Sequence, residues 1–361
     1  MVDWSLPCMG LLASFIGCGL LLPLLRRLAV IDQPGARRLH AHAVVRGGGL
    51  MIVLLMLMAL LLQPLPGFSA EWLLLALIMV AVTGLADDVH GLSAWLKLPL
   101  LAAAAGLLVL AAGSEHAWLS AQLPAELPAW LPNWMAQQSW LLSGLLVVAV
   151  LWFINLFNFM DGSNGLTATQ TILSCAGLLL FADPLALSGA GLATLSWLLL
   201  TITLGFLPWN FPRARMFLGD VGSLSLGLLL AALLLAALKV HAISLPMALL
   251  LPAVFIVDAT ATLCLRLFKG RKWYQAHTDH AYQQLVLRGW SHAQVWWLYL
   301  LANVLLWPLL WLQQQQWLLC LLGYLVLLCG WTLVQYQCGA FRLPSSSAAV
   351  ASSGGQTDHR V

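Results

Sequence analysis

Residues 141–166 read LLSGLLVVAVLWFINLFNFMDGSNGL, an apolar run of membrane length that ends in a group of polar side chains. The first part, 141–154, contains no charged residue. The second part then places Asn155, Asn158 and Asp161 at every third position. Side chains at this spacing share one broad face of a helix, and polar groups at a membrane boundary are costly unless they bind something polar. We therefore predict a membrane helix that ends in a ligand-binding segment, rather than a kink, for which one Asn would suffice.

The whole chain has the composition of a membrane protein. Of its 361 residues, 61% are hydrophobic, 8% are charged and 18 are Trp. No soluble domain of this size needs so apolar a composition. Runs near the length of about 20 residues that spans a bilayer as a helix recur at 5–25, 50–62, 71–86, 96–112, 140–154, 166–182, 191–207, 224–240, 245–265, 294–312 and 317–337. We predict an all-α polytopic membrane protein with about eleven transmembrane helices, ten being the alternative count.

Basic residues predict the orientation, because Lys and Arg near the ends of spans stay in the cytoplasm. With the N-terminus outside, only Lys239 of the sixteen Lys and Arg residues falls outside. The first span is expected to be a retained signal anchor, since no basic segment precedes it. Residues 1–340 then form one membrane domain with cytoplasmic active-site loops, and the Ser-, Gly- and Ala-rich residues 341–361 form a disordered cytoplasmic tail.

Cysteine usage and net charge exclude other classes of site. The seven Cys residues lie in or beside the predicted spans without CxxC spacing, so neither a disulfide framework nor a zinc site is expected. The formal net charge of +3 comes from basic loops that the topology already explains, and no nucleic-acid partner is expected.

Two adjacent carboxylates, Asp87 and Asp88, lie in the segment GLADDVHGLSAWLK at 84–97. Neither topology nor packing requires acids in a cytoplasmic loop. On a helix these neighbours project about 100° apart, so they would not serve one ligand symmetrically. We expect one to face a metal or a substrate phosphate, while the other takes a base, hydroxyl-binding or structural role. A solvated helix end is the alternative.

A third carboxylate, Asp220, lies between two glycines in MFLGDVGSLSLG at 216–227, just after Arg213 and Arg215. A helix N-cap is the simplest explanation for Asp220 alone. A carboxylate on a glycine-flanked loop near arginines also suits a divalent cation that bridges phosphates. Hard oxygen ligands favour Mg²⁺, or Mn²⁺.

The last large cytoplasmic loop, 266–294, is rich in cations and imidazoles. His277 and His280 lie about one helical turn apart, downstream of Arg271. Zinc would need a further clear ligand, so the loop is better suited to binding a pyrophosphate.

Two other features carry weaker signals. Asp258 is an acid inside a predicted span, which suggests a functional role, or an ion pair with Arg266. Three consecutive glycines at 47–49 would let backbone N–H groups bind an anion, or serve as a flexible turn.

Four segments, DDVHGLSAWLK, NLFNFMDGSNGLTATQ, MFLGDVGSLSLG and HTDHAYQQL, occur in this order on the predicted cytoplasmic loops. Together they resemble the bacterial polyprenyl-phosphate N-acetylhexosamine-1-phosphate transferases, in particular the enzymes that initiate lipopolysaccharide O-antigen. The resemblance covers nearly the whole chain. It implies a Mg²⁺-dependent enzyme, with Mn²⁺ as the alternative, in the bacterial inner membrane. The implied reaction transfers sugar 1-phosphate from a UDP-N-acetylhexosamine to undecaprenyl phosphate and releases UMP.

The resemblance also implies roles for the polar residues, all expected in one cytoplasmic cleft. The expected catalytic residues are Asp87, Asp88 and Asp161, and the expected metal ligands are Asp220 and Asp161. The expected substrate-binding residues are Asn155, Asn158, Asn164, Phe217, Arg271, His277 and His280. Asn164 replaces an Asp that is frequent in the family, and His277-Thr-Asp-His280 replaces the His-rich triplet of the peptidoglycan-precursor enzymes. The second departure argues against a muramyl-pentapeptide donor.

Alternatives concern both the mechanism and the class of protein. The lipid phosphate attacks the donor's β-phosphorus directly, or a covalent intermediate forms on Asp87 or Asp88. A secondary transporter would show inverted repeats and acids near the middle of the bilayer, whereas most acids here gather at one face and no clear repeat is visible. A scaffold would leave the polar loops unexplained. The sugar and the oligomeric state stay open, with a homodimer as one alternative.

Overall fold

The structure is a computed structural model, and it describes residues 4–28, 30–32, 43–113, 117–120, 122–123, 128, 130–189, 191–272, 275, 277–311 and 316–338. The predicted tail at 341–361 lies outside these residues. The longer helices are α1 (Ser5–Arg27), α2 (Gly49–Leu62), α3 (Ala70–His90), α4 (Ala94–Ala111), α7 (Ser139–Phe159), α8 (Leu166–Phe181), α10 (Leu192–Asn210), α11 (Gly219–Lys239), α13 (Ala253–Phe268), α15 (His292–Trp311) and α16 (Gln316–Gln337). The shorter ones are α5 (Ala117–Ser120), α6 (Trp130–Gln137), α9 (Pro184–Gly189), α12 (Leu245–Leu250) and α14 (Ala281–Leu287). Two short strands, β1 (Ile31–Asp32) and β2 (Val44–Val45), form an antiparallel ribbon.

The all-α membrane fold predicted from the sequence is confirmed. Within the described residues, eight helices are long and apolar enough to cross a membrane, and α2 and α8 are shorter apolar helices. The predicted total of eleven spans stays a prediction. Lys239, the one basic residue placed outside by the predicted orientation, donates hydrogen bonds to the carbonyls of Gly67 (2.7 Å) and Ala112 (2.6 Å).

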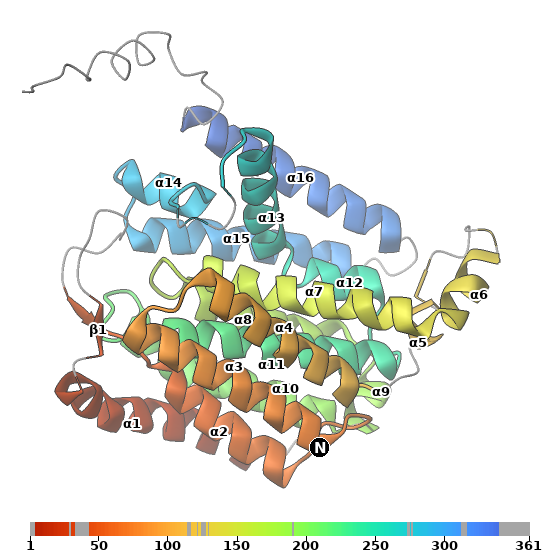
Figure 1. Cartoon of the computed structure of the whole chain (residues 1–361), viewed down its shortest axis with the longest axis horizontal. Helices are drawn as coiled ribbons and strands as arrows, with labels where there is room; N and C mark the ends of the chain where they lie inside the picture. The colour runs from red at the N-terminus through yellow and green to blue at the C-terminus, as the bar shows by residue number, and fades with distance from the viewer. Residues whose placement is uncertain are drawn as a thin grey trace, which may run out of the picture.

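The central helix is α11, which Figure 1 shows among the crowded helices of the bundle. Nearly all of its side chains are buried, and it packs against α2, α3 and α7. Glycines let two neighbours approach closely, because a Cβ atom at Gly49 would overlap Gly222 and one at Gly84 would overlap the backbone of Asp220. Small residues permit such contacts between membrane helices. The start of α11 is therefore held tightly between α2 and the end of α3.

The span expected at 245–265 is broken in two, α12 and α13. Pro252 lies at the break and lacks the N–H that would continue the helix. The carbonyl of Leu251 instead accepts hydrogen bonds from the side chains of Gln170 (3.0 Å) and Ser174 (3.3 Å) on α8. Broken helices persist in a membrane protein only where neighbours satisfy the freed backbone groups. Beyond the break, α13 runs across the direction of α15 and α16 (Figure 1).

The triple-glycine segment pairs with the chain that precedes α11. Gly48 and Gly49 donate their backbone N–H groups to the carbonyls of Phe217 and Leu218, each at 2.9 Å. Those two donors are therefore engaged within the protein, and the anion-binding interpretation of 47–49 is wrong for them. The pairing instead brings Arg46 beside the N-terminus of α11.

Candidate active site

Three carboxylates meet where α3 ends and α11 begins. Asp87 and Asp88 lie in the last turn of α3, and Asp220 lies in the first turn of α11. The expected glycine-flanked loop around Asp220 is thus the start of a helix, which Gly219 enters with a φ of 76°. We call Asp87, Asp88 and Asp220 the acid cluster.

Asp88 anchors the N-terminus of α11. Its fully buried carboxylate accepts hydrogen bonds from the backbone N–H groups of Asp220 (2.9 Å) and Val221 (3.1 Å). Such N–H groups have no partner within their own helix, and a carboxylate stabilises them well. Arg46 lies 3.5 Å from the same carboxylate and 3.6 Å from that of Asp220. The catalytic role implied for Asp88 stays a prediction, but its contacts here are those of a structural anchor.

Lys97, in α4, links the other two acids. Its ammonium donates hydrogen bonds to Asp87 Oδ2 (2.7 Å), to Asn158 Oδ1 (3.2 Å) and to Asp220 Oδ2. The Asn158 amide is oriented by its own bond to Ser223 Oγ, at 3.0 Å. In the sequence, Lys97 is one of the basic residues that indicate the topology, and Ser223 only follows Asp220 near a helix start, so neither is marked as a site residue.

The oxygens around Lys97 form a suitable set for a divalent cation. Two carboxylates and one amide carbonyl converge on a single positively charged group, and Mg²⁺ prefers such oxygen ligands. In the described part of the chain no three His, Cys, Asp or Glu side chains form a metal-binding group, so a site here depends on the Asn158 amide. We infer that Asp87, Asp220 and Asn158 would hold the cation once the Lys97 ammonium moves aside.

Asp161 lies just beyond the C-terminal end of α7. Although it keeps some contact with solvent, burial raises the pKa of its carboxyl well above the usual range. The negative charges of Asp220 and Asp88 add to this effect, while Arg46 opposes it. The carboxyl is therefore inclined to keep its proton unless a cation binds nearby. Its predicted roles as metal ligand and catalytic residue stay predictions.

A cavity of about 390 Å³ opens beside the acid cluster. It is lined by Asp87, Leu92, Ala94, Lys97, Leu98, Asn155, Asn158, Phe159, Gln275, His277, His280 and Gln283. Five predicted site residues thus meet in one space, although they come from α3, α7 and the loop before α14. Ligand sites in proteins have volumes of roughly 300–1,000 Å³. The cavity combines carboxylate, ammonium, amide and imidazole groups, and such groups can bind a phosphate or a metal ion.

The other predicted residues lie outside this lining. Asn164 donates from its amide to the carbonyl of Pro212 (3.1 Å), and the backbone N–H of Phe217 bonds to Val45 (2.7 Å). Arg271 lies 3.4 Å from Asp279 and is half exposed.

Arg266 also pairs with Asp279 and not with Asp258, so the predicted Asp258–Arg266 ion pair is wrong.

The loop before α14 brings two imidazoles over the end of α7. The rings of His277 and His280 lie 5.0 Å apart, and the Tyr282 hydroxyl donates to the Phe159 carbonyl (2.9 Å). Burial lowers the pKa of His277 to about 4, with electrostatic contributions from the neighbouring His280 and Arg266 acting in the same direction. His277 is therefore neutral at pH 7. It can donate a hydrogen bond to a phosphate without carrying a charge, and its predicted role in substrate binding stays a prediction.

The depressed pKa of His277 predicts a pH-dependent stability. An ordinary His gains its proton below about pH 6.5, whereas folded His277 stays neutral to about pH 4, so acid favours the unfolded chain. Between pH 7 and pH 5 we expect this residue to lower the free energy of unfolding by about 2 kcal/mol. The melting temperature of purified His277→Gln should therefore fall less than that of the wild type over this interval. Equal falls would contradict the buried, neutral imidazole.

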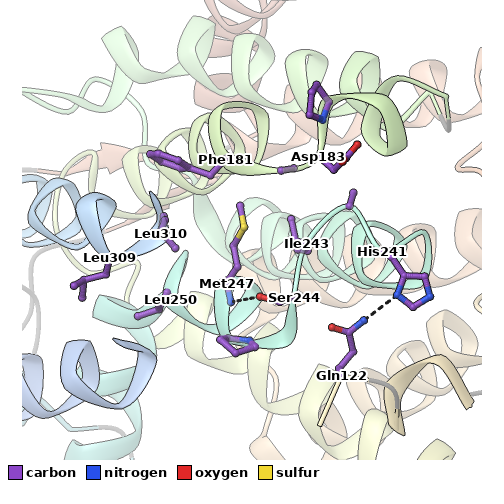
Figure 2. A pocket seen from close by; sticks show the side chains of 14 residues that line it. Gln122, Phe181, Asp183, His241, Ile243, Ser244, Met247, Leu250, Leu309 and Leu310 are labelled. Carbon is purple, nitrogen blue, oxygen red and sulfur yellow. Dashed lines mark hydrogen bonds between the residues drawn. The ribbon is translucent and has the colours of Figure 1, made fainter. Parts of the chain in front are cut away.

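A second cavity, of about 500 Å³, lies at the opposite ends of the helices, between the α8–α9 connection and α12 (Figure 2). Its polar groups are engaged in local structure. Asp183 accepts the N–H groups of Leu185 (2.9 Å) and Ala186 (2.8 Å), and Gln122 bonds to His241 (3.3 Å). None of the predicted site residues lines it.

The chain is similar to one protein family and to several named transferases. The family described as glycosyl transferase family 4 matches residues 71–238, which contain the acid cluster and α7. A probable undecaprenyl-phosphate N-acetylglucosaminyl 1-phosphate transferase of Bacillus subtilis is 26% identical over 78% of this chain and 77% of its own. A decaprenyl-phosphate N-acetylglucosaminephosphotransferase of Mycolicibacterium smegmatis is 30% identical over 80% and 77%. A phospho-N-acetylmuramoyl-pentapeptide-transferase of Synechococcus is 32% identical over 80% and 85%.

Proposed function

We infer the reaction from one premise: the chain belongs to glycosyl transferase family 4, among the polyprenyl-phosphate hexosamine-1-phosphate transferases. It is a multi-pass membrane enzyme that transfers a sugar 1-phosphate from a sugar nucleotide to a polyprenyl phosphate. We propose that the donor is a UDP-N-acetylhexosamine, that the acceptor is undecaprenyl phosphate, and that the enzyme acts in the bacterial inner membrane. The product would initiate O-antigen or a related cell-envelope glycan. Membership of this family argues against the alternative of a secondary transporter.

The observation that carries the proposal is the meeting of Asp87, Lys97, Asn158 and His277 around one cavity. The acceptor phosphate and the donor diphosphate are both anionic, so the main barrier is to bring them together. When bound, Mg²⁺ held by Asp87, Asp220 and Asn158 would neutralise phosphate charge. Lys97 supplies a second positive charge, and neutral His277 supplies an N–H donor.

The reaction is then a single displacement. An ionised oxygen of the polyprenyl phosphate attacks the donor's β-phosphorus and forms a new P–O bond. The bond from that phosphorus to the bridging oxygen breaks, and UMP leaves with the electron pair. Phosphate monoesters have a second pKa of about 6, so the attacking oxygen needs no strong base. Asp88 is engaged by two N–H groups and lies near Arg46, which argues against it as a covalent nucleophile.

The direct route predicts inversion at the β-phosphorus. One displacement inverts a phosphorus made chiral by isotopic labelling, whereas two displacements through Asp87 restore it. We expect the labelled lipid product to show inversion, which phosphorus NMR of the isolated diphosphate would measure. Net retention would replace the direct attack by the covalent route.

The test of the function is UMP release by the detergent-purified enzyme. The donors to compare are UDP-N-acetylglucosamine, UDP-N-acetylgalactosamine and their 6-deoxy analogues, each with undecaprenyl phosphate and Mg²⁺. We expect UMP and a lipid product of matching mass from one donor, and loss of both on chelation of the metal. No UMP from any of these donors would contradict the proposed substrates.

A further inference from the structure

Asp258 in α13 is a deeply buried acid that does not line the active-site cavity. The residue is 3% exposed, and its carboxylate accepts hydrogen bonds from the Tyr299 hydroxyl (2.6 Å), the Trp331 indole (3.2 Å) and the Thr262 hydroxyl (3.1 Å). It also accepts from the backbone N–H of Ala281, at 2.9 Å. A buried carboxylate is costly unless several donors surround it. One acid thus joins α13, α14, α15 and α16.

The Asp258 carboxylate holds the loop before α14, which carries His277 and His280 and which we call the active-site loop. The Ala281 N–H that it accepts begins α14, directly after His280. The His280 imidazole lies 3.6 Å from the same carboxylate, and the His277 ring packs against that of His280. Both imidazoles line the active-site cavity. A shift of Asp258 would therefore move the imidazoles relative to Lys97 and Asn158.

Helix α16 reaches this loop through two buried polar side chains. Trp331 donates its indole N–H to Asp258, and Gln335 donates its amide to the backbone carbonyl of Asp279, at 2.7 Å. Gln335 is 1% exposed and Trp331 is 8% exposed, although most of α16 faces outward. Figure 1 shows α16 at the edge of the bundle, beyond α13. Apolar side chains would pack such a helix without the cost of burying an amide and an indole N–H.

We propose that α16 positions the active-site loop, with Trp331 acting through Asp258 and Gln335 acting through the Asp279 carbonyl. The inference rests on the proposed function and on the expectation that the loop with His277 and His280 binds the donor diphosphate. The three side chains are positioning residues, since none of Asp258, Trp331 and Gln335 lines the active-site cavity. All three positioning residues lie outside the part of the chain that the family model matches, which ends at residue 238.

The test compares Trp331→Phe and Gln335→Leu with Tyr324→Phe. Trp331→Phe removes the indole donor to Asp258 and keeps an aromatic ring, and Gln335→Leu removes the amide donor to the Asp279 carbonyl and keeps a similar bulk. Tyr324→Phe removes a donor on the same helix that bonds to the Leu249 carbonyl (2.9 Å) in α12, away from the loop. A lost hydrogen bond of about 1 kcal/mol corresponds to a roughly fivefold effect. We expect the KM for the sugar nucleotide to rise about fivefold in the first two variants, with the KM for polyprenyl phosphate unchanged.

A merely structural role of α16 gives a different pattern. All three variants would then lower the amount of active enzyme and the maximal rate, and neither KM would move. That result, or wild-type KM values throughout, would overturn the proposal. Tyr324→Phe should keep wild-type KM values for both substrates.

A second readout does not depend on catalysis. Trypsin cleaves after Arg271 and Lys272, which lie in the same loop. Release of the loop should speed this cleavage in Trp331→Phe and Gln335→Leu, but not in Tyr324→Phe. Faster cleavage in an enzyme that releases no UMP from any donor would refute the proposed substrates and leave the positioning role standing. Unchanged cleavage together with unchanged KM in an active enzyme would refute the positioning role alone.

Discussion

Lys97→Met is expected to lower kcat by about 100-fold or more. The ammonium of Lys97 is the cation shared by Asp87, Asp220 and Asn158, and it lines the cavity where two phosphates must meet. Removing one preorganised donor from a site where charge develops typically costs about 10²–10³ in rate. Methionine keeps an unbranched side chain, one atom shorter, but removes the charge. Steady-state UMP release at saturating substrates measures the loss.

The same variant should respond differently to Mg²⁺. Without the ammonium, Asp87 and Asn158 lose their positively charged partner, and only Arg46 stays near Asp220, at 3.6 Å. Mg²⁺ then meets less competition for the oxygens of the site. We expect Mg²⁺ to stabilise Lys97→Met against heat at lower concentrations than it stabilises the wild type, in the absence of substrates. The matched control is Lys239→Met, because Lys239 bonds to two carbonyls at the other end of α11. Equal Mg²⁺ dependence in Lys97→Met and the wild type would contradict a metal site at these oxygens.

Local patterns were sufficient to predict most of the helices. The runs at 71–86 and 140–154 became α3 and α7, each extended into the polar residues that follow. These extensions carry Asp87 and Asn158 to the cavity. The helices do not need either extension to cross a membrane. The break in the predicted 245–265 span was less visible, because it depends on Gln170 and Ser174 from a distant helix.

Long-range pairing accounts for what the sequence did not reveal. Lys97 lies 123 residues from Asp220, and Asp88 reaches the start of α11 across 132 residues. No periodicity within one helix indicates which of two adjacent acids will face a cavity. The sequence did suggest that Asp87 and Asp88 take unequal roles, because their side chains diverge on a helix. Which one anchors and which one lines the site follows only from the packing of α3 against α11.

Asp88→Ala is expected to destabilise the enzyme by about 3 kcal/mol, the scale for breaking a buried charged contact. The change leaves the N–H groups of Asp220 and Val221 without their acceptor and removes a carboxylate from beside Arg46. Asp87→Asn should cost only about 1 kcal/mol, because its amide oxygen still accepts from the Leu92 N–H and Lys97 keeps two other acceptors. Melting temperatures and the yield of monodisperse protein in detergent would measure the difference.

Catalytic activity should show the opposite order, with Asp87→Asn the more damaging change in the folded enzyme. Asp87 faces the cavity, so folded Asp87→Asn should lose about 100-fold in kcat while keeping a melting temperature near that of the wild type. Asp88→Ala should lose activity mainly in proportion to the protein that unfolds, and lower temperature or added Mg²⁺ should recover part of it. If Asp88→Ala were as stable as the wild type and still inactive at every temperature, its carboxylate would have to leave the helix N-terminus and act on substrate. The anchor assignment would then fail, and the covalent route through Asp88 would return.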